Sequence, residues 1–190
     1  MIISKKHRFI LVMTPKSGSR SMRKSLSHIN DTEANSIKAE YKNSKHHLRL
    51  KHLDFDYRDY FVAAFVRNPW DRMVSIYHHA LRSSAKYFPD GIVDFEDFII
   101  NFNKHKSNIG LFYKPCHAYA KHANHVYRFE NINEEFSTMC DSAGLGKIIL
   151  GNEGRLAPRS HYRDFYKTDG MISKVGEIFR EDRKIYGYVF

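Results

Sequence analysis

Two cations, three hydroxyls and a glycine follow the first apolar run of the sequence, in the stretch PKSGSRS at residues 15–21. A glycine permits tight backbone curvature, and a helix that begins here offers N–H groups to an anion. Lys16 and Arg20 add positive charge on either side of Gly18. The hydroxyl donors are Ser17, Ser19 and Ser21. This composition suits a terminal phosphate or sulfate, although an ordinary strand-to-helix turn with solvated charges explains the stretch alone equally well.

The order of residues in this loop departs from the best-known phosphate-binding pattern. A Walker A loop reads G-x-x-x-x-G-K-[ST], so its lysine follows the second glycine. Here Lys16 precedes Gly18, and no glycine lies four to six residues upstream. We also find no strand-terminal aspartate suited to Mg²⁺. An ATP-dependent phosphotransferase of the P-loop type is therefore the weaker alternative.

A second candidate anion site follows another apolar run, in FVRNPWDRMVS at residues 65–75. Arg67 ends the predicted strand, and Ser75 lies eight residues further on, in the predicted helix. A guanidinium and a hydroxyl can reach one anion from different directions. Taken alone, Arg67 is equally suited to pairing with a carboxylate. Asp71 falls in the first helical turn, where its charge favours the helix dipole.

Both loops need a scaffold, and the apolar pattern predicts one. Short apolar runs predict buried strands at 8–13, 60–66 and 125–129. Helical spacing predicts helices at 20–29, from Asn68-Pro69 onward, and at 94–103, 133–143 and 169–184. Strands that alternate with helices indicate an α/β fold, with helices on both faces of a central parallel sheet. Such folds bind ligands beyond the carboxyl ends of their strands, where both loops lie.

Length and composition narrow the class of protein. The 190 residues predict a single domain, 1–190, with a substantial core. The formal net charge of +10 favours anionic partners, so a non-catalytic domain that binds nucleic acid or another polyanion is a further alternative. Most aromatic residues fall on apolar stripes, which disfavours nucleic-acid binding. The sequence predicts a cytoplasmic protein, because it has only two cysteines, Cys116 and Cys140, and no apolar run long enough to span a membrane.

Together the two loops resemble those of the PAPS-dependent sulfotransferases, in particular the carbohydrate-type branch that includes heparan sulfate 2-O-, chondroitin and HNK-1 sulfotransferases. PKSGSRS is similar to the family's 5′-phosphosulfate loop, and FVRNPWDRMVS is similar to its 3′-phosphate motif. YRFENI at 127–132 and the Tyr-Gly-Tyr end of 161–190 resemble the family's closing segments. The resemblance is weak at 30–58 and 84–124, where acceptor specificity would lie.

This resemblance implies a three-layer, P-loop-like fold and a direct reaction. The sulfuryl group would pass in line from PAPS to an acceptor hydroxyl, expected on a saccharide, with PAP as the product and without a metal. Lys16 would contact the 5′-phosphosulfate and stabilise charge on the bridging oxygen, while Arg67 and Ser75 would bind the 3′-phosphate. The 5′-phosphate would be held by Gly18, Ser19, Arg20 and Ser21. Ser17, in the same loop, would also contact the donor. Arg20 stands where many relatives carry a small hydroxyl residue, so its contact stays open.

The reaction also needs a base for the acceptor hydroxyl, and histidine is suited to this role near neutral pH. The 2-O-sulfotransferase branch uses a histidine upstream of the 3′-phosphate motif. The candidates here are His46, His47 and His52, and we rank His47 first. A solvated basic tract or an acidic base is the alternative, since the chain contains 12 histidines.

The remaining polar residues are weaker candidates for the site. Arg159 and Ser160 are predicted either to close over the nucleotide or to cap the last helix. His117, His122 and His125 lie close together in sequence, but their spacing matches no familiar zinc pattern. The sequence predicts neither the oligomeric state nor the identity of the acceptor.

Overall fold

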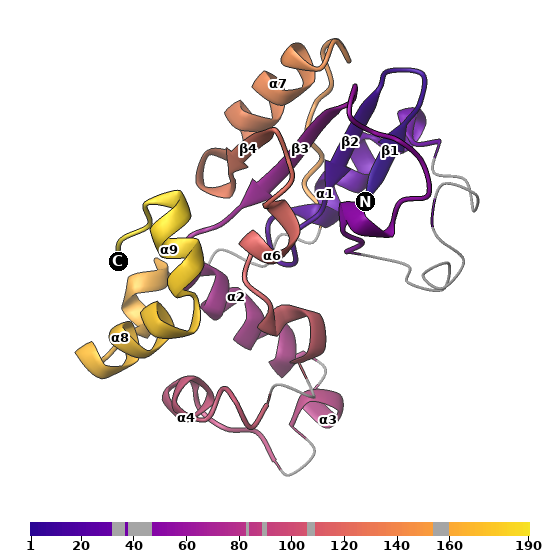
Figure 1. The fold of residues 1–190 in the computed structure, drawn as a ribbon. Helices are drawn as coiled ribbons and strands as arrows, with labels where there is room; N and C mark the ends of the chain where they lie inside the picture. Colours follow the sequence, from indigo (N-terminus) through magenta and orange to yellow (C-terminus); the bar gives the residue numbers. More distant parts are fainter. Residues whose placement is uncertain (32–36, 38–46, 83, 89–90, 106–108, 154–159) are drawn as a thin grey trace. The chain divides into compact units, whose positions relative to one another are not determined.

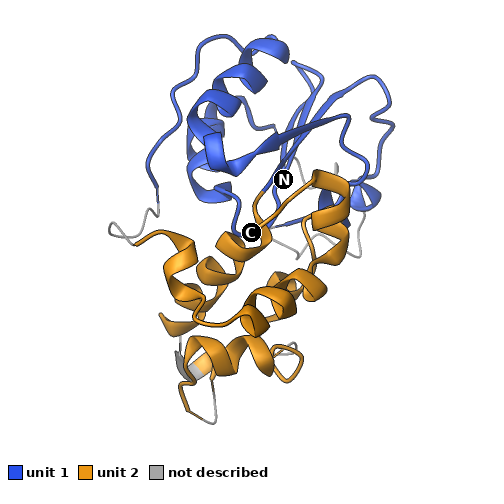
Figure 2. Ribbon diagram, turned by 90° about the vertical axis from the view of Figure 1, so that its left-hand side faces the viewer, with its two compact units in different colours: residues 1–66, 118–155 blue, residues 67–117, 156–190 orange. Residues whose placement is uncertain are grey.

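The computed structural model of the chain is shown in Figure 1. It describes residues 1–31, 37, 47–82, 84–88, 91–105, 109–153 and 160–190. The chain divides into two compact units, each built from two separate segments (Figure 2). Unit 1 comprises residues 1–66 and 118–155, and unit 2 comprises residues 67–117 and 156–190. The single domain expected from the length stays a prediction.

Unit 1 contains the sheet. Within its described residues, four strands pair in the order β1-β2-β3-β4. They are β1 (Ile2–Ser4), β2 (Phe9–Val12), β3 (Phe61–Val66) and β4 (His125–Arg128). β2, β3 and β4 are parallel, as predicted, whereas β1 pairs antiparallel with β2. β1 was not predicted, because three residues are too few to establish a period.

Alternate residues of each strand face opposite sides of the sheet, and both sides are buried in β1, β2 and β3, whereas only Tyr127 is buried in β4. On one side, α1 (Ser19–Ser25) and α7 (Ile132–Ser142) add apolar residues to a shared core (Figure 1). That core includes Phe9, Leu11, Met13, Phe65, Met22, Phe136 and Met139. Burying each such side chain stabilises the fold by about 1.5–3 kcal/mol. The predicted mixed α/β fold, with a mostly parallel sheet flanked by helices, is confirmed.

The shorter elements of unit 1 connect these helices and strands. They are the 3₁₀ turns η1 (Ser27–Ile29), η4 (Leu50–His52) and η6 (Phe129–Asn131). The predicted helix at 20–29 is wrong in its second half, because α1 ends at Ser25 and η1 follows. The short helix α6 (His117–Ala120) bridges the sequence boundary between the units.

Among the described residues of unit 2, the regular elements are all helices. Its elements are α2 (Pro69–Leu81), α3 (Ser84–Tyr87), α4 (Phe95–Ile100), η5 (Gly110–Tyr113), η7 (Tyr162–Phe165), α8 (Asp169–Ile178) and α9 (Arg180–Tyr186). α2 begins where predicted, because Asn68 Oδ1 accepts the N–H groups of Trp70 and Asp71 at 3.0 and 3.3 Å. Asp94 and Thr168 cap α4 and α8 in the same way.

The single helix predicted at 169–184 is wrong, because the chain breaks at Phe179 into α8 and α9. The Phe179 ring is fully buried, and the Arg72 guanidinium lies 4.9 Å from its centre. The break lets Asp182, on α9, accept the N–H groups of Cys116 and His117, both at 2.7 Å. A tertiary contact therefore decides where this helix ends.

Arg72 and Asp182 are both fully buried in unit 2. Arg72 donates from Nη2 to the carbonyls of Lys114 at 2.7 Å and Phe112 at 3.2 Å. Burial raises the pKa of Asp182, while the Arg72 charge and the two N–H donors act in the opposite direction. These contacts attach α2 and α9 to the segment that leads into α6.

None of the helices among the described residues is long and apolar enough to cross a membrane.

Candidate active site

The first loop leaves the carboxyl end of β2 with two residues in left-handed backbone conformations. Lys16 has φ 71° and Gly18 has φ 79°. A Cβ at Gly18 would lie 2.4 Å from Ile132 Cδ1 and 3.3 Å from the Phe129 ring. Glycine is therefore favoured here, because φ is positive and an added Cβ would require the end of the Ile132 side chain to shift. A lysine in this conformation is strained by about 1–2 kcal/mol, and such strain is typical of functional sites.

The side chains of this loop differ in their access to solvent. Ser17 is fully buried, whereas Lys16 and Ser19 are half-buried and Arg20 is exposed. Ser21 donates its hydroxyl hydrogen to the Glu153 carbonyl at 3.0 Å. Of the predicted 5′-phosphate ligands, Lys16, Ser19 and Arg20 thus combine polar side chains with solvent access.

The carboxyl ends of β2 and β3 are joined directly. The register pairs Val12 with Ala64, and the hydroxyl of Thr14 donates to the Phe65 carbonyl. Arg67, the predicted 3′-phosphate ligand, comes two residues after Phe65. Both predicted loops therefore leave the sheet from the same edge of two adjacent parallel strands, as expected.

His47 lies beside the first loop within unit 1. Its Nδ1 is 2.8 Å from the Met13 carbonyl oxygen, three residues before Lys16. A carbonyl can only accept, so Nδ1 carries a hydrogen and the neutral ring presents an unprotonated Nε2. The Tyr119 ring meets the imidazole edge-on, with 6.5 Å between ring centres. His47 also has a left-handed backbone, with φ 55°.

The other candidate bases are placed differently. His52 is buried, and its Nδ1 accepts the Arg49 N–H at 3.1 Å in a cap of η4. This arrangement explains His52 as a structural residue. His46 lies outside the described residues, so the geometry concerns His47 and His52 alone.

The second loop places Arg67 and Ser75 around Asp71, within unit 2. Arg67 donates from Nε to Asp71 Oδ2 at 2.8 Å, and the two side chains are only 7% and 16% exposed. The carboxylate pairing expected as an alternative for Arg67 therefore occurs. Ser75, also buried, lies one helical turn beyond Asp71 on the same face of α2.

Two aromatic residues near this motif have structural contacts. Trp70 is buried, and its Nε1 donates to the Ile172 carbonyl at 2.9 Å. Tyr77 donates its hydroxyl to the Val93 carbonyl, also at 2.9 Å. Arg72, the second arginine of the motif, is enclosed in the core and serves to hold α2 in place.

The last two predicted nucleotide ligands are Arg159 and Ser160. Arg159 lies outside the described residues, and Ser160 is exposed just before η7. Thr168 caps α8 by accepting the Met171 N–H at 3.3 Å. A capping role for Ser160 at this helix is therefore wrong, and its nucleotide contact stays a prediction.

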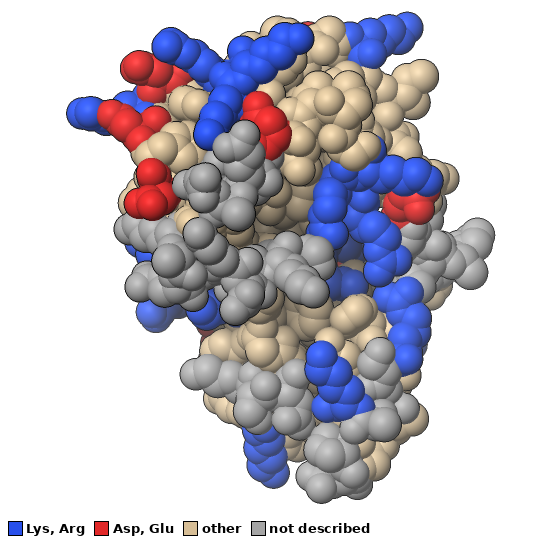
Figure 3. Space-filling view, turned by 90° about the vertical axis from the view of Figure 1, so that its right-hand side faces the viewer, with Lys and Arg blue, Asp and Glu red and all other residues tan. Residues whose placement is uncertain are grey.

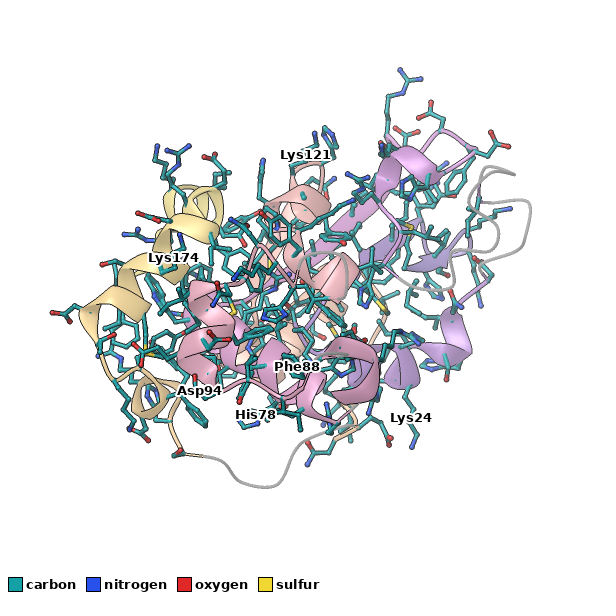
Figure 4. The ribbon with its side chains drawn as sticks, turned by 90° about the horizontal axis from the view of Figure 1, so that it is seen from below. Lys24, His78, Phe88, Asp94, Lys121 and Lys174 are labelled. Carbon is teal, nitrogen blue, oxygen red and sulfur yellow. The ribbon has the colours of Figure 1, made fainter. Side chains whose placement is uncertain are left out.

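Sequence reasoning missed a segment that attaches to α1. Gly151 N–H donates to Ser25 Oγ at 2.7 Å. The exposed Lys24, which is labelled in Figure 4, pairs with the Glu153 carboxylate. With the Ser21 contact described above, residues 151–153 follow the helix that begins at the first loop. Partners separated by more than 120 positions leave no local sequence signal.

No group of three or more His, Cys, Asp or Glu side chains among the described residues is arranged to hold a metal ion. His125 stacks on Phe61, with ring centres 3.8 Å apart. His117 contributes its backbone N–H to Asp182. Cys116 and Cys140 are both buried thiols.

Both polar loops follow the carboxyl ends of parallel strands, which is where α/β sheets bind ligands. A family model described as "Sulfotransferase family" matches residues 1–189. The chain belongs to the sulfotransferase family, and this membership supports an enzyme that transfers sulfuryl groups.

Other comparisons add a distant structural similarity. A sulfotransferase from Alicyclobacillus acidocaldarius is 14% identical, with a TM-score of 0.47, over 95% of this chain and 98% of its own. No curated protein matches the sequence.

Proposed function

We propose that this protein transfers the sulfuryl group of PAPS to an acceptor hydroxyl and releases PAP. The observation that carries the proposal is the hydrogen bond between His47 Nδ1 and the Met13 carbonyl, at 2.8 Å. It ties the candidate base to the loop that contains Lys16. Membership of the sulfotransferase family supports the same chemistry.

The first loop fits the phosphosulfate end of the donor. Gly18 lets the backbone turn tightly, and Lys16 follows the strand in a strained conformation. An ammonium group placed here neutralises the charge that develops on the bridging oxygen as its bond to sulfur breaks. Ser19 and Arg20 supply further donors for the 5′-phosphate, which gives Arg20 a role as a second cation.

His47 serves as the general base. Its Nε2 takes the proton of the acceptor hydroxyl while the acceptor oxygen bonds to sulfur. The Met13 carbonyl accepts the Nδ1 hydrogen, so it holds the ring in this tautomer and stabilises the imidazolium that forms. Proton and sulfuryl group thus move in one step, without a covalent enzyme intermediate.

Arg67 and Ser75 recognise the 3′-phosphate, the group that distinguishes PAPS from an ordinary adenine nucleotide. A guanidinium suits a phosphate because its planar N–H groups match the oxygen geometry. We further propose a saccharide acceptor and a cytoplasmic location. Lys and Arg side chains are numerous on the face drawn in Figure 3, which supports an acidic saccharide.

Two measurements test the proposal. Radiolabelled PAPS should transfer sulfate to at least one member of a panel of glycans and small alcohols. Calorimetry should show that PAP binds far more tightly than 5′-AMP or ADP. Equal affinities would refute the 3′-phosphate assignment, and a lack of transfer across a broad panel despite tight PAP binding would argue for a binding protein.

A further inference from the structure

We propose that Asp71 is a positioning residue that orients Arg67 for the 3′-phosphate and so sets the preference for 3′-phosphorylated nucleotides. The inference rests on the proposed function and deepens it. The carboxylate accepts the Arg67 Nε–H at 2.8 Å, and both side chains are largely withdrawn from water. Burial makes this pair a fixed element and distinguishes it from a fluctuating surface contact.

Asp71 is itself held firmly. Its N–H is capped by Asn68 Oδ1 at 3.3 Å, and its charge lies in the first turn of α2, where the helix dipole favours it. The Tyr166 hydroxyl donates to the Trp70 carbonyl at 2.9 Å. Burial, with a contribution from the Asp71 charge, raises the pKa of Tyr166 and keeps this hydroxyl protonated.

The geometry of the pair suits recognition of a second anion. The bond to Asp71 uses Nε, so the fork of Nη groups lies at the other end of the planar guanidinium. Asp71 and Ser75 are one turn apart on α2, so the carboxylate fixes Arg67 on the helix face that also carries the serine. Asp71 thus directs the Nη donors without touching the phosphate itself.

A purely electrostatic role for Asp71 and a positioning role predict opposite changes in PAP affinity when Asp71 is removed. The direction of the measured change therefore distinguishes the two roles. A carboxylate beside a phosphate site repels the phosphate, so removal of Asp71 would raise PAP affinity if charge were its only contribution. If Asp71 positions Arg67, its removal lowers PAP affinity, because the guanidinium loses its fixed orientation.

The test compares PAP and 5′-AMP binding by calorimetry in Asp71→Ala, Asp71→Asn and Arg67→Ala. We expect Asp71→Ala to weaken PAP binding about tenfold or more, the range expected for a lost charged hydrogen bond, while 5′-AMP affinity stays within about twofold. Asp71→Asn keeps an acceptor oxygen for Nε and should recover most of the loss. In the Arg67→Ala background no guanidinium remains to be positioned, so Asp71→Ala should cause no further loss of PAP affinity, and the removed charge should raise it.

Asp169→Ala is the matched control, since Asp169 also lies in the first turn of a helix, α8, and is exposed. It should leave both affinities unchanged. The inference is overturned if Asp71→Ala raises PAP affinity, weakens PAP and 5′-AMP equally, or adds to the effect of Arg67→Ala. A wild-type protein that binds PAP and 5′-AMP equally overturns the proposed function instead, so the two failures are distinguishable.

Discussion

Replacing His47 with asparagine separates the chemistry of this residue from its structural contribution. Asparagine tolerates the left-handed backbone that His47 adopts, with φ 55°. Its amide N–H is a donor suited to the Met13 carbonyl, which accepts from His47 at 2.8 Å. It has no group that can take a proton at neutral pH. The variant therefore removes the base and preserves the local contacts.

We expect His47→Asn to lower kcat by about 10²–10⁴-fold, the usual contribution of a general base. This loss corresponds to about 3–5 kcal/mol of transition-state stabilisation. The structural cost should stay below about 1 kcal/mol, since the hydrogen bond is replaced and its net worth is about 0.5–1.5 kcal/mol. PAP affinity and Tm should therefore match those of the wild type.

The assay is single-turnover transfer of radiolabelled sulfate, with calorimetry of PAP and a thermal melt of each variant. His52→Asn is the control, because an asparagine oxygen can still accept the Arg49 N–H that His52 accepts at 3.1 Å. It should retain wild-type kcat. Full activity in His47→Asn would refute the assignment of the base, and a joint loss of PAP affinity and Tm would show that the residue is structural.

Three further substitutions test the loop and the core. Lys16→Gly removes a cation and a strained backbone together, so transfer should be abolished while Tm does not fall; a lower Tm would contradict the strain. Gly18→Ala should cost at least about 2 kcal/mol of unfolding free energy, because its new methyl group would lie 2.4 Å from a neighbouring side-chain carbon. Gly144→Ala, with φ 66° and no atom within 4 Å, is its control and should lose only the smaller conformational term, so equal losses in denaturant unfolding would refute the packing argument. Asp182→Ala should cost about 3–5 kcal/mol, because two backbone N–H groups lose their acceptor and the buried Arg72 guanidinium loses the favourable charge of Asp182. That loss corresponds to a fall in Tm of about 10 °C, whereas the exposed neighbour Glu181→Ala should change stability by less than about 0.5 kcal/mol.

Local signals were sufficient for the elements that carry the site. The apolar runs predicted β2, β3 and β4 to within two residues at each end. The Asn68-Pro69 pair marked the first turn of α2 because both the cap and the proline act within that turn. These predictions were correct because the residues that determine these elements lie close together in the sequence.

Long-range contacts account for what the sequence could not predict. The break at Phe179 depends on Asp182 reaching backbone groups some 65 residues away. His47 was ranked first among three histidines by resemblance, but its bond to Met13 spans 34 residues and crosses a tract with no clear pattern. The Arg67–Asp71 pair, by contrast, is an i,i+4 contact, so it was foreseeable as an alternative.

Backbone strain supports the choice of catalytic residues independently of any motif. Among the described residues, the non-glycine positions with positive φ are Arg8, Lys16 and His47. Arg8 closes the tight turn between β1 and β2, where its N–H donates to the Lys5 carbonyl at 3.2 Å, so the turn explains its conformation. Lys16, in the turn that follows β2, and His47 each carry a similar penalty of about 1–2 kcal/mol. Both were proposed for the reaction from side-chain chemistry and from the resemblance to the sulfotransferases. Strain persists where the surroundings impose it, and at these two positions it holds a cation and the proposed base beside the same strand end.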